Sequence, residues 1–453
     1  MFQVIEVPLW LLGVILLFAA ITFASHFLFP SVRWFFRRRM EKAVAKLNEK
    51  LDRPIEPFKL ARRHDMIQRL TYDEEVSRAI AEHARKEGVP ENVAFERARR
   101  YAREIVPSFS ATLYYGVAMR LTKFISRLLY RVRLGHHARE TLATIDREAT
   151  VVFVMNHRSN MDYVLVTYLA SEQSTLSYAV GEWARVWPLS RLIKSMGAYF
   201  IRRKSRGALY RKVLQRYVRL ATDGGVTQAV FPEGGLSLDG KLGKAKVGIL
   251  KYIAEGHDTK ERDVVFIPVA INYDRVLEDR VLIQAGEQGT RKFPAKISVI
   301  LRYLLRLLWQ WMRGRYHRFG YAAVSFGAPI SLRREKGRKK EADVEALAET
   351  LMRRIAEVVP VLPVPLAALV FERAEGPLTK EGFEKAMRVL SDKMPEAHIH
   401  LPREDFDYAA DYGLRNLVSR GAVEQTGAGF AVTEAGASLV TYYAASVRHL
   451  IAD

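Results

Sequence analysis

The residues with the clearest chemical potential lie in the stretch 156–162, which reads Asn-His-Arg-Ser-Asn-Met-Asp. A histidine takes up a proton from a hydroxyl group near neutral pH, because imidazole titrates in that range. If Asp162 folds back onto the second ring nitrogen of His157, its carboxylate fixes the tautomer and stabilises the imidazolium as it forms. The pair is therefore a candidate base with its orienting carboxylate. The alternative is a surface histidine followed by an aspartate that caps a helix.

The residues on either side place this stretch at a turn between a strand and a helix. Residues 149–155 form a short, β-branched apolar run bounded by charge, which predicts a buried strand over 151–155. Residues 163–169 open a helix, with Asp162 in or near its first turn. Proteins of the α/β class commonly place their chemistry at such turns.

A second block of polar residues follows another predicted strand. The segment 149–335 alternates short apolar runs with helical stretches, which predicts an α/β domain. The strand at 198–201 ends in Arg202 and Arg203, two guanidinium groups that could grip a phosphate. We expect further strands over residues 227–231, 264–271 and 322–326.

The third block follows the strand at 227–231. Its glycines, Gly234 and Gly235, let the backbone approach a ligand. Glu233 could accept a hydrogen bond from a substrate hydroxyl, and the alternative is a structural turn carboxylate. The strand at 264–271 carries a proline, and we expect it to shape the pocket rather than to react.

Composition narrows the classes of partner. The chain has 453 residues, a net charge of +21 and no cysteine. This length predicts about two or three domains. The charge indicates a polyanionic partner, namely a membrane surface, nucleic acid or a phosphorylated substrate. The lack of cysteine excludes thiol nucleophiles, disulfides and cysteine-ligated metals. No cluster of histidines and carboxylates has the spacing of a metal site, so we expect no metal and no cofactor.

The N-terminal residues predict a membrane anchor. Residues 7–29 are uncharged, almost wholly apolar and long enough to cross a bilayer as a helix. Arg33 and Arg37–Arg39 follow, so domain 1–30 is expected to be a single-pass anchor in the inner (cytoplasmic) membrane, with the rest of the chain on the cytoplasmic side. A signal peptide is the rival interpretation, but the run is too long for one and is preceded by Glu6 rather than by Lys or Arg.

Residues 31–110 have helical spacing and no evident chemistry, so we expect a helical neck. The next predicted domain, 111–148, contains a basic amphipathic helix over 111–133 that suits an anionic lipid surface. The alternative is a helix packed on the core. Its apolar stripe is Leu113, Val117, Leu121, Phe124, Ile125, Leu128 and Val132, and its basic stripe is Arg120, Lys123, Arg127 and Arg131.

Two later segments complete the domain prediction. Residues 297–313 are apolar but interrupted by arginines, which predicts a second membrane-surface contact or the apolar wall of a ligand site, with core packing as the alternative. The C-terminal domain, 345–453, contains helices, a hairpin over 422–433 and a last helix through 442–450. This order suggests a winged-helix-like unit.

In this order and spacing the blocks resemble the glycerolipid acyltransferase family, and within it the membrane-bound glycerol-3-phosphate acyltransferases. The resemblance rests on His-Arg-Ser-x-Met-Asp-Tyr at 157–163 and on Gly-Ala-x-Phe-Ile-Arg-Arg at 197–203. It covers residues 149–335 and is echoed at 324–330 and 442–450. The fold that it implies is α/β, a mixed sheet flanked by helices.

The resemblance also implies the chemistry. His157 would deprotonate the 1-hydroxyl of glycerol 3-phosphate, held by Asp162, and the alkoxide would attack an acyl thioester on coenzyme A or acyl carrier protein. The product would be lysophosphatidate. Backbone amides of the turn are candidate donors to the tetrahedral oxyanion. The expected substrate contacts are Arg158, Ser159, Arg202, Arg203, Glu233, Gly234, Gly235, Lys241 and Lys246.

One departure concerns the third block. After Glu-Gly-Gly the resembled branch usually has Arg-Ser-Arg, whereas this chain has Leu236, Ser237 and Leu238. Without these two arginines the identity of the acceptor stays open. The alternative is a lysophosphatidate acyltransferase, which makes phosphatidate. Lys241 and Lys246 could compensate, although an ammonium is a point charge and not a bidentate fork. Their alternative is a solvated basic loop.

A rival from another class is a membrane-tethered nucleic-acid-binding protein that uses the winged-helix-like unit. The helix before the hairpin offers only Arg415 and Arg420 to a groove. A scaffold that has lost activity is disfavoured because His157, Asp162 and Glu233 are all present. The expected partners are therefore anionic membrane lipids, glycerol 3-phosphate and an acyl thioester, and no nucleic acid.

Overall fold

A computed structural model describes residues 8–451 apart from 50, 52, 136–144, 171–175, 182–188, 203–206, 256, 291–308, 310, 311, 314–317 and 334–342. The chain divides into two compact units, residues 1–55 and residues 56–453. The predicted boundaries near residues 30, 110 and 345 do not coincide with this division. Most of the predicted segment at 297–313 lies outside the described residues, and its described apolar members Trp309 and Met312 are 49% and 64% exposed.

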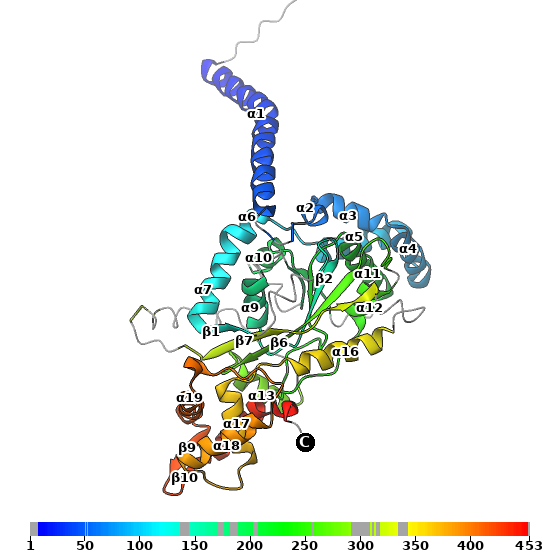
Figure 1. Ribbon diagram of the computed structural model, residues 1–453. Helices are drawn as coiled ribbons and strands as arrows, with labels where there is room; N and C mark the ends of the chain where they lie inside the picture. Colours follow the sequence, from blue (N-terminus) through cyan, green and yellow to red (C-terminus); the bar gives the residue numbers. More distant parts are fainter. Residues whose placement is uncertain are drawn as a thin grey trace, which may run out of the picture. The chain divides into compact units, whose positions relative to one another are not determined.

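The larger unit is built around an eight-stranded mixed sheet, which confirms the predicted α/β fold class (Figure 1). Its order is β1-β7-β6-β2-β5-β3-β4, and β8 also pairs with β6. The neighbours are parallel except that β6 is antiparallel to β7 and β8. The strands are β1 (Arg131–Leu134), β2 (Thr150–Met155), β3 (Ser177–Gly181), β4 (Tyr199–Ile201), β5 (Gln228–Val230), β6 (Val264–Tyr273), β7 (Tyr321–Phe326) and β8 (Ile330–Ser331).

The alternation of side chains along the central strands divides the core into two layers. In β2, Val151, Phe153 and Met155 belong to one apolar cluster, whereas Val152 and Val154 belong to the other. Successive residues of a strand point to opposite faces, so a sheet buried on both faces has a continuous apolar sequence. This is why residues 149–155 read as an uninterrupted apolar run.

One face of the sheet is covered by α3 (Arg63–Thr71), α4 (Glu74–Glu87), α5 (Glu91–Ile105), α11 (Ala208–Asp223), α12 (Gly248–Ala254) and α16 (Val344–Glu357). In α5, Ala94, Ala98 and Ala102 are wholly buried at a spacing of four residues, which lets neighbouring helices approach closely. These helices share their core with the sheet. Residues 56–110 are therefore helical as predicted, but they form part of the sheet unit rather than a separate neck.

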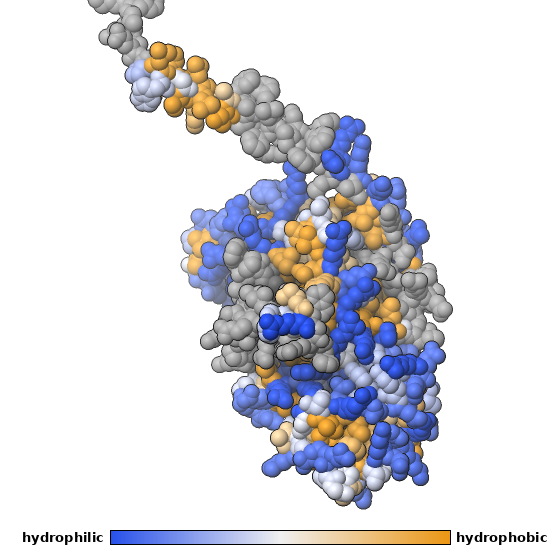
Figure 2. Space-filling model, turned by 90° about the vertical axis from the view of Figure 1, so that its left-hand side faces the viewer, coloured by the Kyte–Doolittle hydropathy of each residue, from blue (hydrophilic) through white to orange (hydrophobic). Residues whose placement is uncertain are grey.

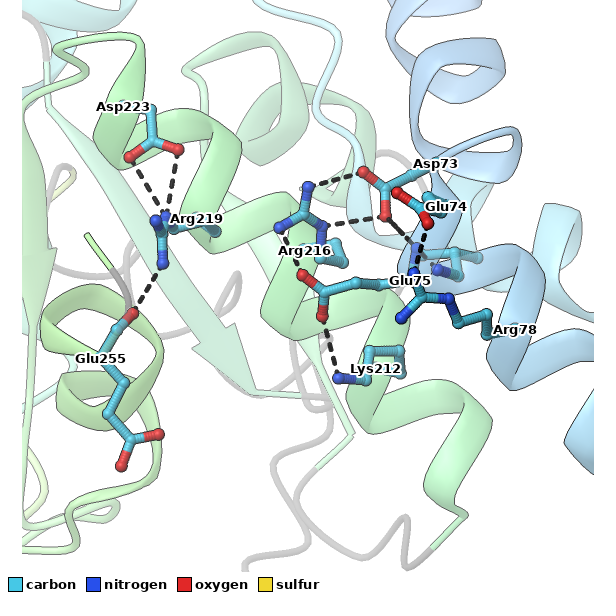
Figure 3. Close-up of polar contacts among 10 residues, drawn as sticks. Asp73, Glu74, Glu75, Arg78, Lys212, Arg216, Arg219, Asp223 and Glu255 are labelled. Carbon is cyan, nitrogen blue, oxygen red and sulfur yellow. Dashed lines mark hydrogen bonds and ion pairs between the residues drawn. The ribbon is translucent and has the colours of Figure 1, made fainter. Parts of the chain in front are cut away.

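Ion pairs join α4 to α11 (Figure 3). Asp73 caps α4 by accepting from the backbone N–H groups of Glu75 and Val76. The Arg216 guanidinium donates to both carboxylate oxygens of Asp73, at 2.9 and 2.6 Å, and to Glu75 at 2.9 Å. Lys212 donates to the second oxygen of Glu75 at 3.1 Å. A bidentate arginine of this kind positions one helix on the other.

The other face is covered by α9 (Met161–Ala170) and by helices that follow β6 in the chain. These are α13 (Asp279–Glu287), α17 (Pro363–Arg373), α18 (Lys380–Asp392), α19 (Phe406–Ser419) and α20 (Ala437–Ala444). Every residue from Pro363 to Phe371 is buried, so α17 is a core helix. Figure 1 shows the C-terminal helices gathered together with the hairpin, away from α4 and α5.

The helix–hairpin–helix order predicted for the C-terminal region is present. The hairpin pairs β9 (Val423–Thr426) with β10 (Gly429–Val432). The last helix is shorter than predicted, because α20 ends at Ala444 and only a 3-10 turn, Arg448–Leu450, follows. Apolar spacing continues past the end of α20, and the sequence pattern therefore overstated its length.

The predicted amphipathic helix also ends earlier than expected. It is composed of α6 (Ala111–Leu113), a π-helical turn (Tyr114–Ala118) and α7 (Met119–Leu129). Residues 131–134 leave the helix and form β1, which pairs in parallel with β7. The prediction of helix to residue 133 was wrong, because Val132 continues the helical stripe but is used as a strand residue. Two short helices, α2 (Pro57–Leu60) and α10 (Leu189–Ser195), complete this unit.

The smaller unit contains α1 (Leu9–Asn48). Its described apolar residues near the N-terminus are largely exposed, and this stretch of the helix is hydrophobic in Figure 2. Among the helices of the described residues, none combines the length and the apolar character needed to cross a bilayer. The membrane span predicted from residues 7–29 therefore stays a prediction.

A buried carboxylate links the sheet to α17. Asp274, which is 1% exposed, follows β6 and accepts from the backbone N–H groups of Tyr321 at 2.8 Å and Val364 at 3.0 Å. Desolvation by burial raises the pKa of Asp274 to about 7 from its ordinary value of 3.8, against the opposing effect of those two hydrogen bonds. The protonated form is thus favoured more strongly in the folded than in the unfolded protein.

This shift predicts a pH-dependent stability. The contribution of Asp274 is fully present below its unfolded pKa and is lost as the pH rises through the folded value of about 7. The thermal midpoint of the natural protein is therefore expected to fall relative to that of Asp274→Asn between about pH 5 and pH 7.5. The variant keeps one acceptor oxygen, so a constant loss of stability accompanies the altered slope. Asp392→Asn, at an exposed position ending α18, is the matched control. Parallel profiles for all three proteins would contradict the prediction.

Candidate active site

The predicted catalytic stretch, residues 156–162, forms the turn between β2 and α9, as the sequence indicated. Asn156 anchors the start of this turn. Its side-chain amide donates to the carbonyl of Ile271 at 2.9 Å, and its side-chain oxygen accepts from the N–H of Ile271 at 2.8 Å. The side chain thus pairs with the backbone of β6. This catalytic turn is therefore fixed to the central strand of the sheet.

The carboxylate of Asp162 lies at the centre of the turn and has no exposed surface. Its Oδ2 lies 2.9 Å from Nδ1 of His157 and accepts from the backbone N–H groups of Arg158 at 2.7 Å and Ser159 at 3.0 Å. Its Oδ1 accepts from the hydroxyl of Tyr273 at 2.6 Å. The structure therefore brings together the two residues that the sequence singled out, and adds Tyr273 as a third.

These contacts determine the tautomer of His157. A carboxylate that already accepts two N–H groups at Oδ2 can only accept from the ring as well, so the proton sits on Nδ1. The Nε2 atom then carries the lone pair that a general base needs. The ring is 2% exposed, packs 4.2 Å from the ring of Phe231 and meets Tyr163 edge-on at 5.4 Å. The orientation of the imidazole is therefore fixed on several sides.

Glu233 braces the turn from the third sequence block. Its Oε1 accepts from the backbone N–H of His157 at 2.9 Å, and its Oε2 accepts from that of Gly243 at 2.9 Å. Burial raises the pKa of Glu233, and these hydrogen bonds act in the opposite direction. Both oxygens are engaged by backbone, which is the structural role that the sequence left open as the alternative.

Glu278 holds the middle of the turn, and the sequence did not single it out. Its Oε2 accepts from the hydroxyl of Ser159 at 2.7 Å. Its Oε1 accepts from the backbone and side-chain N–H groups of Asn160 at 3.2 and 3.1 Å. Burial raises the pKa of Glu278. Ser159 is wholly buried in this arrangement, so its hydroxyl shapes the turn in this structure.

Together these contacts engage the backbone N–H groups of the turn. The backbone N–H of residue 157 donates to Glu233, those of residues 158 and 159 donate to Asp162, and that of residue 160 donates to Glu278. The N–H groups of residues 161 and 162 donate to the hydroxyl and to the carbonyl of Ser159, respectively. The expectation that turn amides supply the donors to an oxyanion is therefore not supported. The sequence could not show this, because two of the acceptors lie far along the chain.

Arg158 turns away from the surface. Its side chain is 2% exposed, donates through Nη1 to the carbonyl of Gly240 and lies 5.6 Å from the ring of Tyr442. Its Nε and Nη2 atoms are buried and have no hydrogen-bond partner among the described residues. Gly240 is required at this contact, because a Cβ there would lie 1.9 Å from the carbonyl oxygen of Tyr442.

The predicted phosphate arginines are placed differently from one another. Arg202 follows β4 and pairs with Glu104 of α5 at 2.8 Å, and its guanidinium lies 5.4 and 5.8 Å from the ring centres of Tyr101 and Tyr210. The hydrogen bond to Glu104 raises the pKa of Arg202. Its guanidinium is thus engaged by a carboxylate in this structure. Arg203 lies outside the described residues.

The glycine and lysine positions of the third block lie next to the turn. Gly234 has a φ of +67°, which favours glycine, and a Cβ there would lie 2.9 Å from the Lys246 side chain. Gly235 is buried, whereas Lys241 and Lys246 are exposed. The backbone N–H of Lys246 donates to the carbonyl of Pro232 at 2.7 Å, which folds the lysine loop back over the start of the block.

The two leucines that depart from the resembled pattern have a packing role. Leu236 and Leu238 are half-buried against the apolar cluster that contains β2 and the C-terminal helices. A Cβ on Gly286 of α13 would lie 3.3 Å from the Cβ of Leu238. Arginine side chains at positions 236 and 238 would face an apolar surface. Leucines at these positions instead let the loop pack against the apolar cluster.

The C-terminal helices reach this site through Asp279. Its Oδ2 accepts from the Arg420 guanidinium at 2.5 Å and from the Tyr443 hydroxyl at 2.5 Å, and the arginine and aspartate side chains are 7% and 6% exposed. The Tyr443 hydroxyl in turn accepts from the backbone N–H of Val276 at 2.9 Å. Asp279 directly follows Glu278 and begins α13, so the C-terminal region is tied to the residue that holds the turn.

Two family models match the chain in agreement with this geometry. The Acyltransferase model matches residues 134–272, which include the turn and Glu233, and a model described as the glycerol-3-phosphate acyltransferase C-terminal region matches residues 304–453. Together the two models cover most of the chain, which is thus similar to the glycerolipid acyltransferase family. The recognition made from the sequence blocks is thereby confirmed.

Curated relatives of this chain carry the name glycerol-3-phosphate acyltransferase. One from Aeromonas hydrophila is 27% identical over 87% of this chain and 51% of its own length. One from Ectopseudomonas mendocina is 30% identical over 60% of this chain and 32% of its own length. The chain thus spans about half the length of the relatives that it matches most broadly. A solved 1-acyl-sn-glycerophosphate acyltransferase from Thermotoga maritima is 20% identical, with a TM-score of 0.34 over 54% of this chain and 80% of its own.

The geometry of the site predicts a role for the Tyr273 hydroxyl. Tyr273→Phe keeps the ring but removes the hydrogen bond to Asp162, so the carboxylate holds His157 less firmly. A hydrogen bond to a charged group contributes about 1.5–3 kcal/mol, so the rate constant of acyl transfer is expected to fall about tenfold or more, with little change in KM. The pH profile of the rate is expected to move as well, since the base changes its environment.

A matched control is Tyr130→Phe. The Tyr130 ring lies 5.2 Å from that of Tyr273, and its hydroxyl donates to the carbonyl of Arg275 instead of to Asp162. Equal losses in the two variants would show that Tyr273 acts only through packing.

Proposed function

We propose that this chain transfers an acyl group from an acyl thioester to the 1-hydroxyl of glycerol 3-phosphate. The observation that carries the proposal is the buried contact between His157 and Asp162, with Nε2 left as the base. The printed names of the curated relatives and of the C-terminal family model support this choice of acceptor.

The chemistry follows from the position of the proton. Nε2 of His157 takes the proton of the acceptor hydroxyl as its oxygen bonds to the thioester carbonyl carbon. Asp162 stabilises the imidazolium that results. The tetrahedral intermediate then collapses, the carbon–sulfur bond breaks, and the leaving thiolate receives the proton from Nε2. The products are the acyl ester and a free thiol, on coenzyme A or on acyl carrier protein.

A lysophosphatidate acceptor is the second candidate, because Leu236 and Leu238 stand where the resembled branch has arginines. Both leucines pack against the core, and Arg202 is paired with Glu104, so a clamp for a free phosphate would depend on other cations. Lys241 and Lys246 are exposed on the neighbouring loop and could serve. The two candidates share the same base and differ only in the hydroxyl that is acylated.

Parallel acceptor assays test the function. Membranes containing the chain are offered labelled glycerol 3-phosphate or lysophosphatidate, each with acyl-CoA and with acyl carrier protein. Transfer to glycerol 3-phosphate is expected, with a loss of at least about a hundredfold in His157→Gln, since a general base contributes that much or more. His64→Ala, at an exposed histidine, is the control. Transfer to lysophosphatidate alone would select the second candidate, and transfer to neither would contradict both.

We further propose that the chain works at the cytoplasmic face of the inner membrane, on anionic lipid. The apolar stripe on α6 and α7 supports this. Leu113, Val117, Leu121 and Phe124 are 36–56% exposed. The residues at helical spacing on the opposite face, the first of which is Tyr114 and the last Ser126, are buried. Arg120 and Arg127 flank the stripe and are exposed. Figure 2 looks onto the side of the molecule on which α7 lies in Figure 1, and shows hydrophobic patches among hydrophilic ones.

The predicted anchor belongs to the same proposal. Leu9 and Trp10 of α1 are 87% and 71% exposed, and most apolar residues up to Ile21 are exposed as well. Such a surface is stabilised by contact with lipid. Anionic lipid would also attract the net charge of +21.

A spin label can report membrane contact at α7, because the chain has no cysteine of its own. A nitroxide attached at Val117→Cys, in the π-helical turn that leads directly into α7, is expected to become accessible to oxygen, and shielded from a water-soluble relaxation agent, when anionic vesicles are added. Val389→Cys on α18 is the matched control, because Val117 and Val389 are valines of similar exposure, 56% and 48%. If the label at 117 stays as accessible to the aqueous agent as the label at 389, α7 does not enter the membrane surface.

A further inference from the structure

A cavity of about 220 Å³ lies at the other edge of the sheet from His157. Its lining includes Ser177, where β3 begins, and Gly197, which precedes β4. His157 instead lies beyond the last residue of β2. The strands β2, β5, β3 and β4 are parallel, so their first residues share one edge and their last residues share the opposite edge. The cavity is therefore distinct from the catalytic turn.

A lysine without an acidic partner among the described residues lines this cavity. The ammonium of Lys59 donates to the carbonyl of Leu176 at 3.0 Å and lies 4.8 Å from the ring centre of Phe109 and 5.9 Å from that of Tyr114. Burial lowers the pKa of Lys59 well below its ordinary value. One neutral oxygen and two rings offset only part of the cost of desolvating an ammonium. An anion bound beside Lys59 would supply the missing charge.

The backbone is shaped to leave room for this lysine. Gly197 has a φ of +88°, and a Cβ there would lie 2.9 Å from Cε of Lys59 and 3.3 Å from the ring of Phe109. The hydroxyl of Ser177 donates to the carbonyl of Gly197 at 2.6 Å and holds this backbone in place. A side chain at position 197 would thus compete with Lys59 for the same space.

Two further cations stand around the cavity. Arg62 is exposed, and its guanidinium has no hydrogen bond or ion pair within the described part of the chain. Arg63 donates to the carbonyls of Val106 and Arg103, and burial together with the charge of Arg103 lowers its pKa. None of the described residues that line the cavity is an aspartate or a glutamate. The charged residues that line this space are therefore all cationic.

We propose that this cavity binds the phosphate group of a small phosphate ester, with Lys59 as the inner ligand and Arg62 at the mouth. A phosphate offers several oxygens, which suit the three donors of an ammonium together with a guanidinium fork. The volume is below the roughly 300–1,000 Å³ of pockets for drug-sized ligands, so the ligand is a small ester or a lipid headgroup. Phe58 and Leu60 at the cavity provide an apolar side that either source could contact. The proposal does not depend on the acyl transfer proposed above.

Competitive acetylation of lysines, read by mass spectrometry on the full chain in detergent micelles, tests the site directly. The probes are inorganic phosphate, glycerol 3-phosphate, and micelles that contain phosphatidate in place of phosphatidylcholine. A probe in about tenfold excess over its dissociation constant is expected to slow acetylation of Lys59 about tenfold, because that fraction of sites is then occupied. The exposed Lys393 is the internal control and is expected to react at an unchanged rate.

The arms of the experiment distinguish the two sources. Protection by the soluble esters would show that the ligand is a free phosphate ester, and protection only by phosphatidate would show that it is a lipid headgroup. Arg62→Ala, which removes an exposed side chain, is expected to raise the concentration for half-protection about tenfold, as loss of a charge-assisted hydrogen bond does. The readout at Lys59 is separate from acyl transfer, so a failure of either proposal is seen on its own. Equal protection by chloride at matched ionic strength, or none by any probe, would overturn the proposal.

Discussion

The carboxylate of Asp162 has no exposed surface and accepts four hydrogen bonds, one from the imidazole that it orients and three from the chain around it. Burying a carboxylate costs several kcal/mol unless its oxygens are satisfied, so these bonds are a condition for the turn to exist. The same bonds fix the proton on Nδ1 of His157 and leave the lone pair on Nε2, the proposed base. The folding of the turn and the proposed chemistry therefore depend on the same side chain.

Two neighbouring carboxylates extend this constraint to the rest of the molecule. Glu278 accepts from Ser159 and Asn160 in the turn, while Asp279 accepts from Arg420 and Tyr443. One peptide bond separates the two, so the C-terminal helices and the catalytic turn are held against the same end of α13. This gives a physical reason why the acyltransferase segment and the C-terminal region occur together in one chain.

Local signals in the sequence predicted β2, β4, β5, β6 and β7 and the pairing of His157 with Asp162, because both depend on neighbouring residues, whereas β3 and β8 were not predicted. The apolar run before His157 predicted β2, and the spacing to Asp162 predicted the pair. The edge strand β1 was missed because Arg131 and Arg133 flank an apolar residue that continues a helical stripe. Tyr273 and Glu278 could not be found in this way, since nothing near them in the sequence shows that they meet the turn. Such contacts are set by the order of strands, which one sequence does not reveal.

The order of the strands also determines when this site can form during synthesis of the chain. The Tyr273 hydroxyl, which donates to Asp162, comes 111 positions after that aspartate in the sequence. The Tyr443 hydroxyl, which accepts from the N–H of Val276, comes 167 positions after that valine. Contacts between distant parts of a chain form late, after the intervening segments have emerged and collapsed. During synthesis His157 therefore lacks part of its supporting hydrogen bonds, and its proposed ability to activate a hydroxyl would arise only after the C-terminal helices have left the ribosome.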